Sequence, residues 1–436
     1  MTLSRWRSWA PTLGLLLLTG YQLWGVALVP FHPDESSLLF QSRDFEAIFR
    51  SPASLAWSAG REPDPELSYR LLNAPLSKYV LGLGRGLAGV DGAEVSVDWD
   101  WSRDWIANLG AGALPTPSAL LAGRIASSLL LPLAALFLYL GGKQLGGPWV
   151  GGLAAALLGL NALVLVHGRR AMAEGTLIFA ISFALWSLVE PRKRPWLSGL
   201  GIGLALGAKH SALALLPVGI LAMLWGADPP QAIRHKLSSV GTFGLVLLAV
   251  TLALNPVVWS EPASALREIF QVRMSLVQDQ IQAQAIAEQL AIAVPLRGID
   301  RLAVLIAHLF LAPPQFQEIG NYRAELDSSV ARYLAIPGHA LLRGRTLGGL
   351  SLGLTLAGLF FGVATLRTGS RSVSRTSALL LISTAALALT LYIGIPLPYQ
   401  RYYVPLVPLV SLWSAFAVIR LGREMKKLPF IRAALG

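Results

Sequence analysis

The sequence predicts an all-α protein that crosses a membrane many times. Of its 436 residues, 54% are hydrophobic and only 14% are charged, whereas a soluble protein needs a more polar surface. Runs of Leu, Ala, Val and Gly recur at about the 20 residues that a helix needs to cross a bilayer. The chain has no cysteine, which excludes disulfides and cysteine-based catalysis or metal binding.

About ten segments are interpreted as spanning helices. The first follows Arg5 and Arg7, as the core of a signal peptide would, but it lacks a small-residue cleavage site and is interpreted as a retained helix. The ten segments are 11–29, 118–140, 149–166, 172–189, 197–208, 211–226, 237–258, 346–366, 376–395 and 402–420.

Two places leave the topology open. As one helix, the run 197–226 would be about 45 Å long and would carry Lys209 and His210 at its middle. Two short helices that turn at 208–210 keep these polar groups at the outer edge and are the preferred interpretation, because one long helix would reverse the topology that follows. The segment 299–312 is short for a crossing and carries His308. It is interpreted as re-entrant or interfacial, and it is an eleventh crossing if it spans.

Basic residues set the predicted orientation. They gather in short connections between the apolar runs: Lys143, 191–195, 234–236, 367–375 and 422–427. The positive-inside rule places these connections in the cytoplasm, and both termini with them. The same distribution explains the net charge of +12. No basic face with aromatic platforms is present, so nucleic-acid binding is not expected.

The two long loops, 30–117 and 259–345, are then extracytoplasmic. The first holds 12 of the 24 Asp and Glu residues, and its mixed apolar and charged segments are typical of short helices on a membrane surface. The second opens with apolar residues at helical spacing over 262–290. We found no solenoid repeat and no sizeable soluble domain, so residues 1–436 are predicted to form a single transmembrane domain.

Four charged motifs lie on the predicted outer side. They are "HPDE" at 32–35, "NAPLSKY" at 73–79, "HGRRAMAEGTL" at 167–177 and "PLPYQRYYVPLVPLV" at 396–410. Glu174 lies about one turn inside an apolar helix, where a carboxylate usually has a partner or a function. Arg170, four residues earlier, makes a structural salt bridge one interpretation, and a polar cavity is the other. Arg169, Arg170 and Arg401 are suited to bind phosphate or to anchor the helices at the interface.

These motifs together resemble the membrane glycosyltransferases of the GT-C class, and within it the dolichyl-phosphate-mannose protein mannosyltransferase and aminoarabinose-transferase group (glycosyltransferase family 39). Asp34–Glu35 is similar to the Asp-Glu pair that follows the first helix of that group. "NAPLSKY" resembles its Pro-Pro-Leu-x-Lys element, and "RRAMAEGTLIF" its Arg-x-x-x-x-acid segment. "GLALGAKHSAL" resembles its Gly-rich helix that turns at a Lys, and "RYYVPLVPLV" the start of its last helix. Order and spacing match over nearly the whole chain.

The resemblance implies transfer of a sugar, a hexose such as mannose or a similar one, from a polyprenyl-phosphate carrier to an extracytoplasmic protein, glycolipid or polymer, with inversion. It places the active site on the outer face of a plasma (inner) membrane. It assigns the role of base to Asp34 and places Glu35 and Glu174 in the catalytic site. The lipid phosphate and the sugar are expected to contact Lys78, Arg169, Arg170, Lys209, His210, Arg401 and Tyr402.

Departures and alternatives remain. Asn73 and Ala74 stand where relatives often have an acid or His followed by Pro, and the six histidines lack ligand-like spacing. No cofactor is therefore assigned, and a divalent metal is left as an alternative that the ligand spacing does not support. Asp34 also suits a helix N-cap. A transporter is the rival function, but transporters usually bind substrate at the midplane between repeated halves, and no such halves are evident here.

Overall fold

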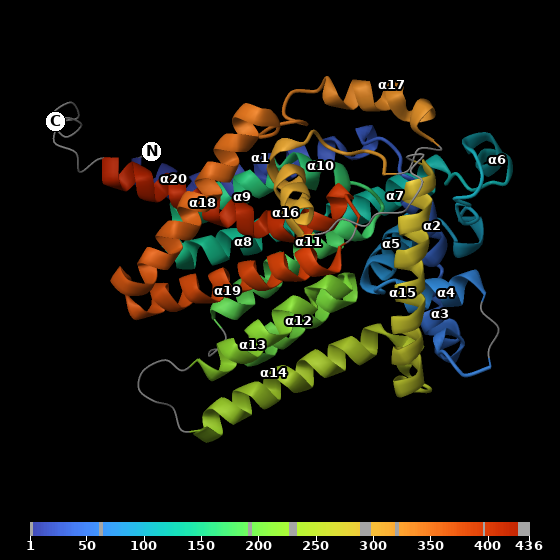
Figure 1. Cartoon of the computed structure of the whole chain (residues 1–436), viewed down its shortest axis with the longest axis horizontal. Coiled ribbons are helices and arrows are strands. Elements are labelled where there is room, and N and C mark those ends of the chain that lie inside the picture. The colour runs from blue at the N-terminus through green and yellow to red at the C-terminus, as the bar shows by residue number, and fades with distance from the viewer. Residues whose placement is uncertain are drawn as a thin grey trace.

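The computed structural model describes residues 3–60, 64–190, 194–225, 233–287, 298–318, 322–395 and 397–425. Over these ranges the chain forms helices joined by turns and contains no β-strand. The apolar helices lie side by side as a bundle (Figure 1). They are α1 (Leu3–Trp24), α7 (Pro117–Ser128), α8 (Leu130–Gly146), α9 (Pro148–Gly159), α11 (Ala173–Val189), α12 (Pro195–Ala208), α13 (Leu215–Leu224), α14 (Ile233–Leu254), α18 (Gly344–Thr368), α19 (Arg371–Gly394) and α20 (Val407–Met425).

The helices make this a multi-pass membrane protein. Among the described residues, five helical segments are long and apolar enough to cross a membrane: Pro117–Gly146, Ile233–Leu254, Gly344–Thr368, Arg371–Gly394 and Gln400–Met425. A sixth is counted if Leu13–Leu28 and Pro33–Arg50, bent by 101°, form one span. Shorter apolar helices are Pro148–Gly159, Ala173–Val189, Pro195–Ala208 and His210–Leu224. The all-helical class is confirmed, and a count of ten crossings stays a prediction.

Two predicted segments are interrupted. The segment 149–166 is two helices, α9 and α10 (Ala162–His167), because Asn161 caps the second by accepting a hydrogen bond from the Leu163 N–H at 2.9 Å. The run 197–226 breaks at Lys209, whose backbone is extended between α12 and the 3-10 helix η4 (His210–Ala214). The interpretation of this run as two short helices is confirmed.

Small residues let the bundle helices approach closely. α8 packs against α9 and α11, and α18 against α20. A Cβ at Gly142 would lie 2.8 Å from the Cα of Gly151, and one at Gly358 would meet the backbone of Trp413. Membrane helices associate largely through such close packing, because lipid offers no hydrophobic drive for helix pairing. The bundle therefore supplies a rigid frame for its ends.

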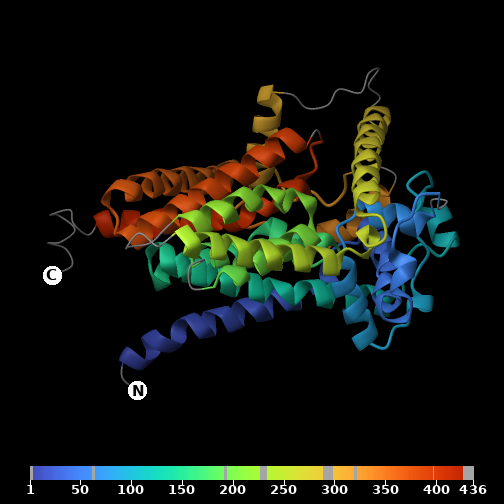
Figure 2. The ribbon, with the colours of Figure 1, turned by 90° about the horizontal axis from the view of Figure 1, so that it is seen from below.

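The loop helices gather at one end of the bundle, and α1 begins and α20 ends at the other (Figures 1 and 2). If both termini lie on the same side of the membrane, this is the arrangement expected. The helices at the loop end are α2 (Pro33–Gln41), α3 (Asp44–Arg50), α4 (Pro65–Leu72), α5 (Leu76–Leu87), α6 (Trp105–Gly110), α15 (Pro262–Ala287) and α17 (Arg323–Leu334). The segment 299–312 forms α16 (Gly298–Ile306) and a π-turn at Ala307–Leu311.

Candidate active site

The motif "HPDE" builds the start of α2. His32 is the N-cap, and its Nδ1 accepts a hydrogen bond from the Asp34 N–H at 3.1 Å. The Glu35 carboxylate accepts one from the His32 N–H at 3.0 Å, which completes a capping box. Pro33 occupies the first turn, where its missing N–H costs nothing. The interpretation of Asp34 as the N-cap is therefore wrong, and its carboxylate is not used to cap the helix.

Glu35 points inward and is fully paired. Its carboxylate makes a two-point ion pair with Arg124 of α7, at 2.7 and 2.8 Å, and accepts a hydrogen bond from the Ala171 N–H at 2.9 Å. Burial opposes the charge, but Arg124 and these hydrogen bonds hold the pKa of Glu35 below its usual value. Both oxygens are engaged, so Glu35 ties α2 to α7 and to the loop before α11, and offers no free acceptor to a ligand.

Asp34 points the other way, toward Arg401 of the 3-10 helix η7 (Gln400–Leu406), with which it forms an ion pair. Its side chain is 26% exposed and that of Arg401 is 12% exposed. The Arg401 Nε lies 3.3 Å from Oε1 of Glu318, and Oε2 of Glu318 lies 2.5 Å from Nε2 of His32. The result is a chain of contacts from Asp34 through Arg401 and Glu318 to His32.

The charges in this chain fix the protonation of the acids. Burial alone would raise the pKa of Asp34, but Arg401 and then His32 hold it below the usual value. The pKa of Glu318 is lowered in the same way, because Arg401 and His32 outweigh the effect of burial. Asp98 differs: burial raises its pKa, and the charge of Asp34 adds to the increase. Asp34 is therefore ionised at neutral pH.

A second ion pair lies beside the first. The Lys209 Nζ is 3.2 Å from Oε1 of Glu174, and Oε2 of Glu174 has no partner among the described residues. Both cations lie near the ring of Tyr402, whose centroid is 5.0 Å from the Lys209 Nζ and 5.6 Å from the Arg401 guanidinium carbon. The partner of Glu174 is thus Lys209, and the predicted Arg170–Glu174 salt bridge is wrong.

Three predicted phosphate-binding cations are used by the protein itself. Lys78 is 2% exposed, and its Nζ lies 2.5 Å from Asp44, which Arg70 also binds at 2.7 Å. Arg169 donates to the Gln22 and Tyr21 carbonyls, the Tyr333 hydroxyl and the His339 ring. Arg170 donates to the carbonyls of Pro30 and Phe316. They join the first helix and both outer loops, and only Nη1 of Arg170 among their side-chain nitrogens has no hydrogen-bond partner in the described part of the chain.

His210 is exposed and opens η4, one residue after Lys209. The predicted residues that the structure brings together are therefore Asp34, Arg401, Tyr402, Lys209 and Glu174. Sequence reasoning missed Glu318 and Asp98. Asp98 accepts a hydrogen bond from the Tyr69 hydroxyl at 2.7 Å. The acidic character of the first loop was the available signal for Asp98, and no local pattern marks Glu318.

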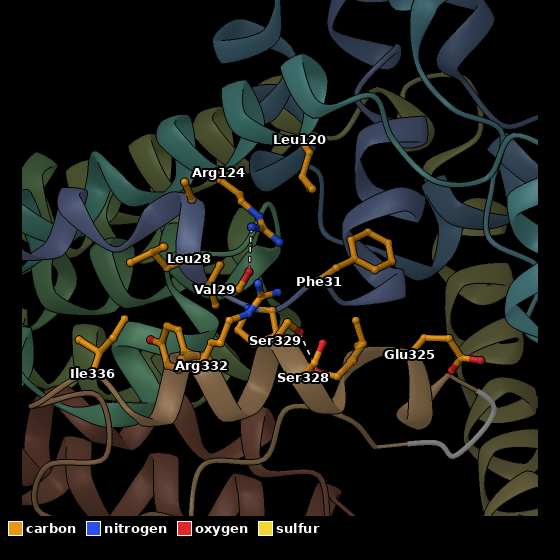
Figure 3. Close-up of a pocket in the computed structure, with 14 residues that line it drawn as sticks. Leu28, Val29, Phe31, Leu120, Arg124, Glu325, Ser328, Ser329, Arg332 and Ile336 are labelled. Atoms are coloured by element: carbon orange, nitrogen blue, oxygen red, sulfur yellow. Dashed lines mark hydrogen bonds between the residues drawn. The ribbon is translucent and has the colours of Figure 1, made fainter.

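A cavity of about 520 Å³ lies between α17, α7 and the link from α1 to α2. Its walls are mostly apolar, and Figure 3 shows Arg124 of α7 and Arg332 of α17 on opposite sides of it. The cavity reaches the Glu35–Arg124 pair through Arg124. It is not lined by Asp34, Arg401, Lys209 or Tyr402. In the described part of the chain, no three His, Asp or Glu side chains are arranged to hold a metal ion.

Part of the chain matches a known protein family. Residues 66–258 match the model of the family described as dolichyl-phosphate-mannose-protein mannosyltransferase, which confirms the resemblance predicted from the sequence. The matched range includes Glu174 and Lys209, and Asp34 and Arg401 lie outside it. Among curated proteins, none matches this sequence.

Solved structures from Archaeoglobus fulgidus share the fold. The apo oligosaccharyltransferase of Archaeoglobus fulgidus is 12% identical, with a TM-score of 0.53 over 99% of this chain and 52% of that chain. The Archaeoglobus fulgidus AglB complex with an inhibitory peptide and a dolichol-phosphate is 12% identical, with a TM-score of 0.52 over 98% and 54%. ArnT from Cupriavidus metallidurans bound to undecaprenyl phosphate is 15% identical, with a TM-score of 0.46 over 99% and 64%. The chain spans about half the length of the two archaeal structures.

The chemistry available to the site follows from its charges. An ionised carboxylate at a helix start is suited to accept a proton. Two cations beside the same aromatic ring are suited to hold a phosphate and to stabilise negative charge that develops on it. These groups lie at the loop end of the helix bundle.

Proposed function

We propose that the chain is a membrane glycosyltransferase that moves a sugar from a polyprenyl-phosphate donor to an acceptor on the outer face of the membrane. The observation that carries the proposal is the pairing of Asp34 with Arg401 beside Lys209 and Tyr402. A candidate base and two candidate phosphate ligands are together at one end of the bundle. The family match over 66–258 supports the same reaction class.

The reaction is a single displacement at the anomeric carbon. The acceptor oxygen attacks that carbon and gives its proton to Asp34, which is worth about 10²–10⁴-fold in rate for a general base. The bond from the anomeric carbon to the phosphate oxygen breaks, and its electron pair stays on the lipid phosphate. Arg401 and Lys209 stabilise that charge. One displacement inverts the configuration of the sugar.

Glu174 and Glu35 have different roles in this scheme. Glu174 orients Lys209 through its bound oxygen and presents its unpartnered oxygen to a sugar hydroxyl. Glu35 holds the start of α2 in place through Arg124, so it positions Asp34 without touching the substrate. Lys78, Arg169 and Arg170 are assigned to the frame that joins the outer loops.

The membrane arrangement is part of the proposal. About ten crossings, with the short apolar helices included, put both termini in the cytoplasm and the loop end outside a plasma membrane. The chain then acts as a single transmembrane domain whose two long loops cover the site. The lipid tail of the donor stays in the bilayer while its phosphate reaches Arg401. A protein hydroxyl, a glycolipid or a cell-envelope polymer is the acceptor.

A transfer assay tests the proposal. The protein is reconstituted in nanodiscs with a panel of radiolabelled polyprenyl-phosphate sugars and a membrane extract as the acceptor pool. Label that moves into the extract with the wild type and not with Asp34→Asn supports the proposal. Well-folded protein that transfers label from no donor contradicts it, and solute uptake into vesicles without a covalent product would instead support a transporter.

A further inference from the structure

The candidate base and the candidate phosphate ligand neutralise each other in this structure. Arg401 pairs with Asp34 through Nη1, and both side chains are only partly exposed. A carboxylate held by a guanidinium is a weak base, because the cation favours its charged form. A guanidinium held by a carboxylate is in turn a weak receptor for another anion. Neither group is available for its proposed task while the pair is closed.

Arg401 has a second acidic partner that can hold it when the first is lost. Its Nε lies 3.3 Å from Glu318, whose other oxygen is 2.5 Å from the His32 ring. The side chains of His32 and Glu318 are 0% and 3% exposed. The hydrogen bond from His32 fixes the position of Glu318, and Arg401 is held to Glu318 by opposite charge, with no hydrogen bond from its Nε to any described residue. Glu318 therefore keeps the guanidinium at the site after its Nη1 leaves Asp34.

Another cation, Lys209, shares a neighbour with Arg401. Lys209 and Arg401 both contact the ring of Tyr402. A lipid phosphate that binds both cations competes directly with Asp34 for Arg401. Arginine is suited to this exchange, because its planar guanidinium binds carboxylate and phosphate in the same way.

We infer that the Asp34–Arg401 ion pair is a latch opened by the donor: the lipid phosphate takes Arg401 from Asp34 and thereby frees the base. The inference rests on the proposed function and adds an order of events to it. The donor binds first, and Asp34 gains basicity only in the donor complex. The acceptor proton then goes to Asp34 as the sugar–phosphate bond breaks toward the lipid phosphate. When polyprenyl phosphate leaves, Arg401 returns and Asp34 releases the proton to water.

Binding of sugar-free undecaprenyl phosphate to the purified protein in nanodiscs tests the latch without any turnover. Asp34→Asn removes the competitor for Arg401 and is expected to tighten binding about tenfold, which corresponds to ~1.4 kcal/mol. Asp98→Asn is the matched control, since it removes a nearby negative charge that is bound to Tyr69 instead of Arg401. It is expected to change binding by less than about twofold. Asp34→Ala is a second variant, and the melting temperature checks folding in each.

The binding and transfer results separate the latch from the proposed function. Binding by Asp34→Asn that is unchanged, weaker, or tightened no more than by Asp98→Asn overturns the latch. A wild type that transfers sugar while Asp34→Asn binds no tighter overturns the latch and leaves the glycosyltransferase intact. A wild type that neither transfers sugar nor binds undecaprenyl phosphate overturns both.

Discussion

Replacing Glu35 by Gln tests whether this residue holds the site together. Glu35 is fully buried and binds Arg124 at two points, with further hydrogen bonds from the Ala171 and His32 N–H groups. A Gln side chain has one oxygen, so its NH₂ group would face N–H donors, and Arg124 would lose its counter-charge. Removing one partner of a buried ion pair costs about 3–5 kcal/mol. The shift in melting temperature per kcal/mol decreases with chain length, and we take roughly 1–2 °C per kcal/mol for a chain of this size. The melting temperature should therefore fall by about 3–10 °C.

Tryptophan fluorescence of the nanodisc-embedded protein on heating measures this loss. Arg103→Gln is the control, because its pair with Asp100 is 55% and 43% exposed and such pairs contribute less than about 1 kcal/mol. The double variant Glu35→Gln/Arg124→Gln should cost less than the two single changes together, since it leaves no unpaired buried charge. If the melting temperature of Glu35→Gln stayed within 2 °C of the wild type instead of falling by roughly 3–10 °C, the Glu35–Arg124 pair would not hold the site together.

Other predictions concern the site itself. Asp34→Asn should lower the transfer rate about 10²–10⁴-fold with an unchanged melting temperature, and a rate within about threefold of the wild type would exclude it as the base. Burial raises and Arg401 lowers the pKa of Asp34, with a net value below 3.8, so the base stays charged on acidification until the pH falls below that value. The acid limb of kcat/KM for the donor should therefore lie below about pH 4, and a limb above pH 5 would contradict it. Arg401→Lys should weaken undecaprenyl phosphate binding about tenfold, or ~1.4 kcal/mol, in direct titrations, and equal affinity would show that its fork geometry is not used. Lys209→Met should destabilise the protein by about 3 kcal/mol, because it leaves Glu174 unpaired. The double variant Lys209→Met/Glu174→Gln should recover at least half of the lost melting temperature, and no recovery would contradict the pairing.

The fold class follows from the sequence because the bilayer imposes a simple rule of helix length and apolarity. The break at Lys209 was predictable for the same reason, since two polar residues interrupt a run that is too long for one crossing. The turn at the start of α2 was also visible in "HPDE", although the residue that caps it is His32 and not Asp34. The break at Asn161 was missed, because a single capping Asn in an apolar run is a weak signal.

The pairing of charges was much harder to predict. Glu174 and Arg170 have helical spacing, yet the chain is not helical at Arg170, because α11 begins only at Ala173. Glu174 instead meets Lys209, 35 residues away, because α11 packs on α12. Glu318 enters the site from a loop 286 residues beyond its partner His32. Such contacts depend on tertiary packing, which local spacing does not encode.

Arginines that suggest phosphate binding in a sequence can equally bind the backbone. Arg169 and Arg170 lie in the motif that most resembles a ligand site, but carbonyl groups of Gln22, Tyr21 and Pro30 accept their hydrogen bonds. Tyr21 and Gln22 are in the last turn of α1, where helix carbonyls have no partner within the helix, and Pro30 is in non-helical backbone, which needs such donors where water is scarce. An outer-loop arginine in a protein of this kind therefore has two physical explanations, and only the fold separates them.

The most direct test of the proposed displacement compares the amount of free polyprenyl phosphate released with the amount of sugar transferred. The two quantities are followed in one reaction with a radiolabelled polyprenyl-phosphate sugar, for the wild type and for Asp34→Asn. A single displacement yields equal amounts of both products with the wild type, and both are lost with the variant, which still binds the lipid phosphate. Release without transfer, or transfer that persists in Asp34→Asn, would contradict a displacement in which Asp34 takes the acceptor proton and Arg401 holds the leaving phosphate.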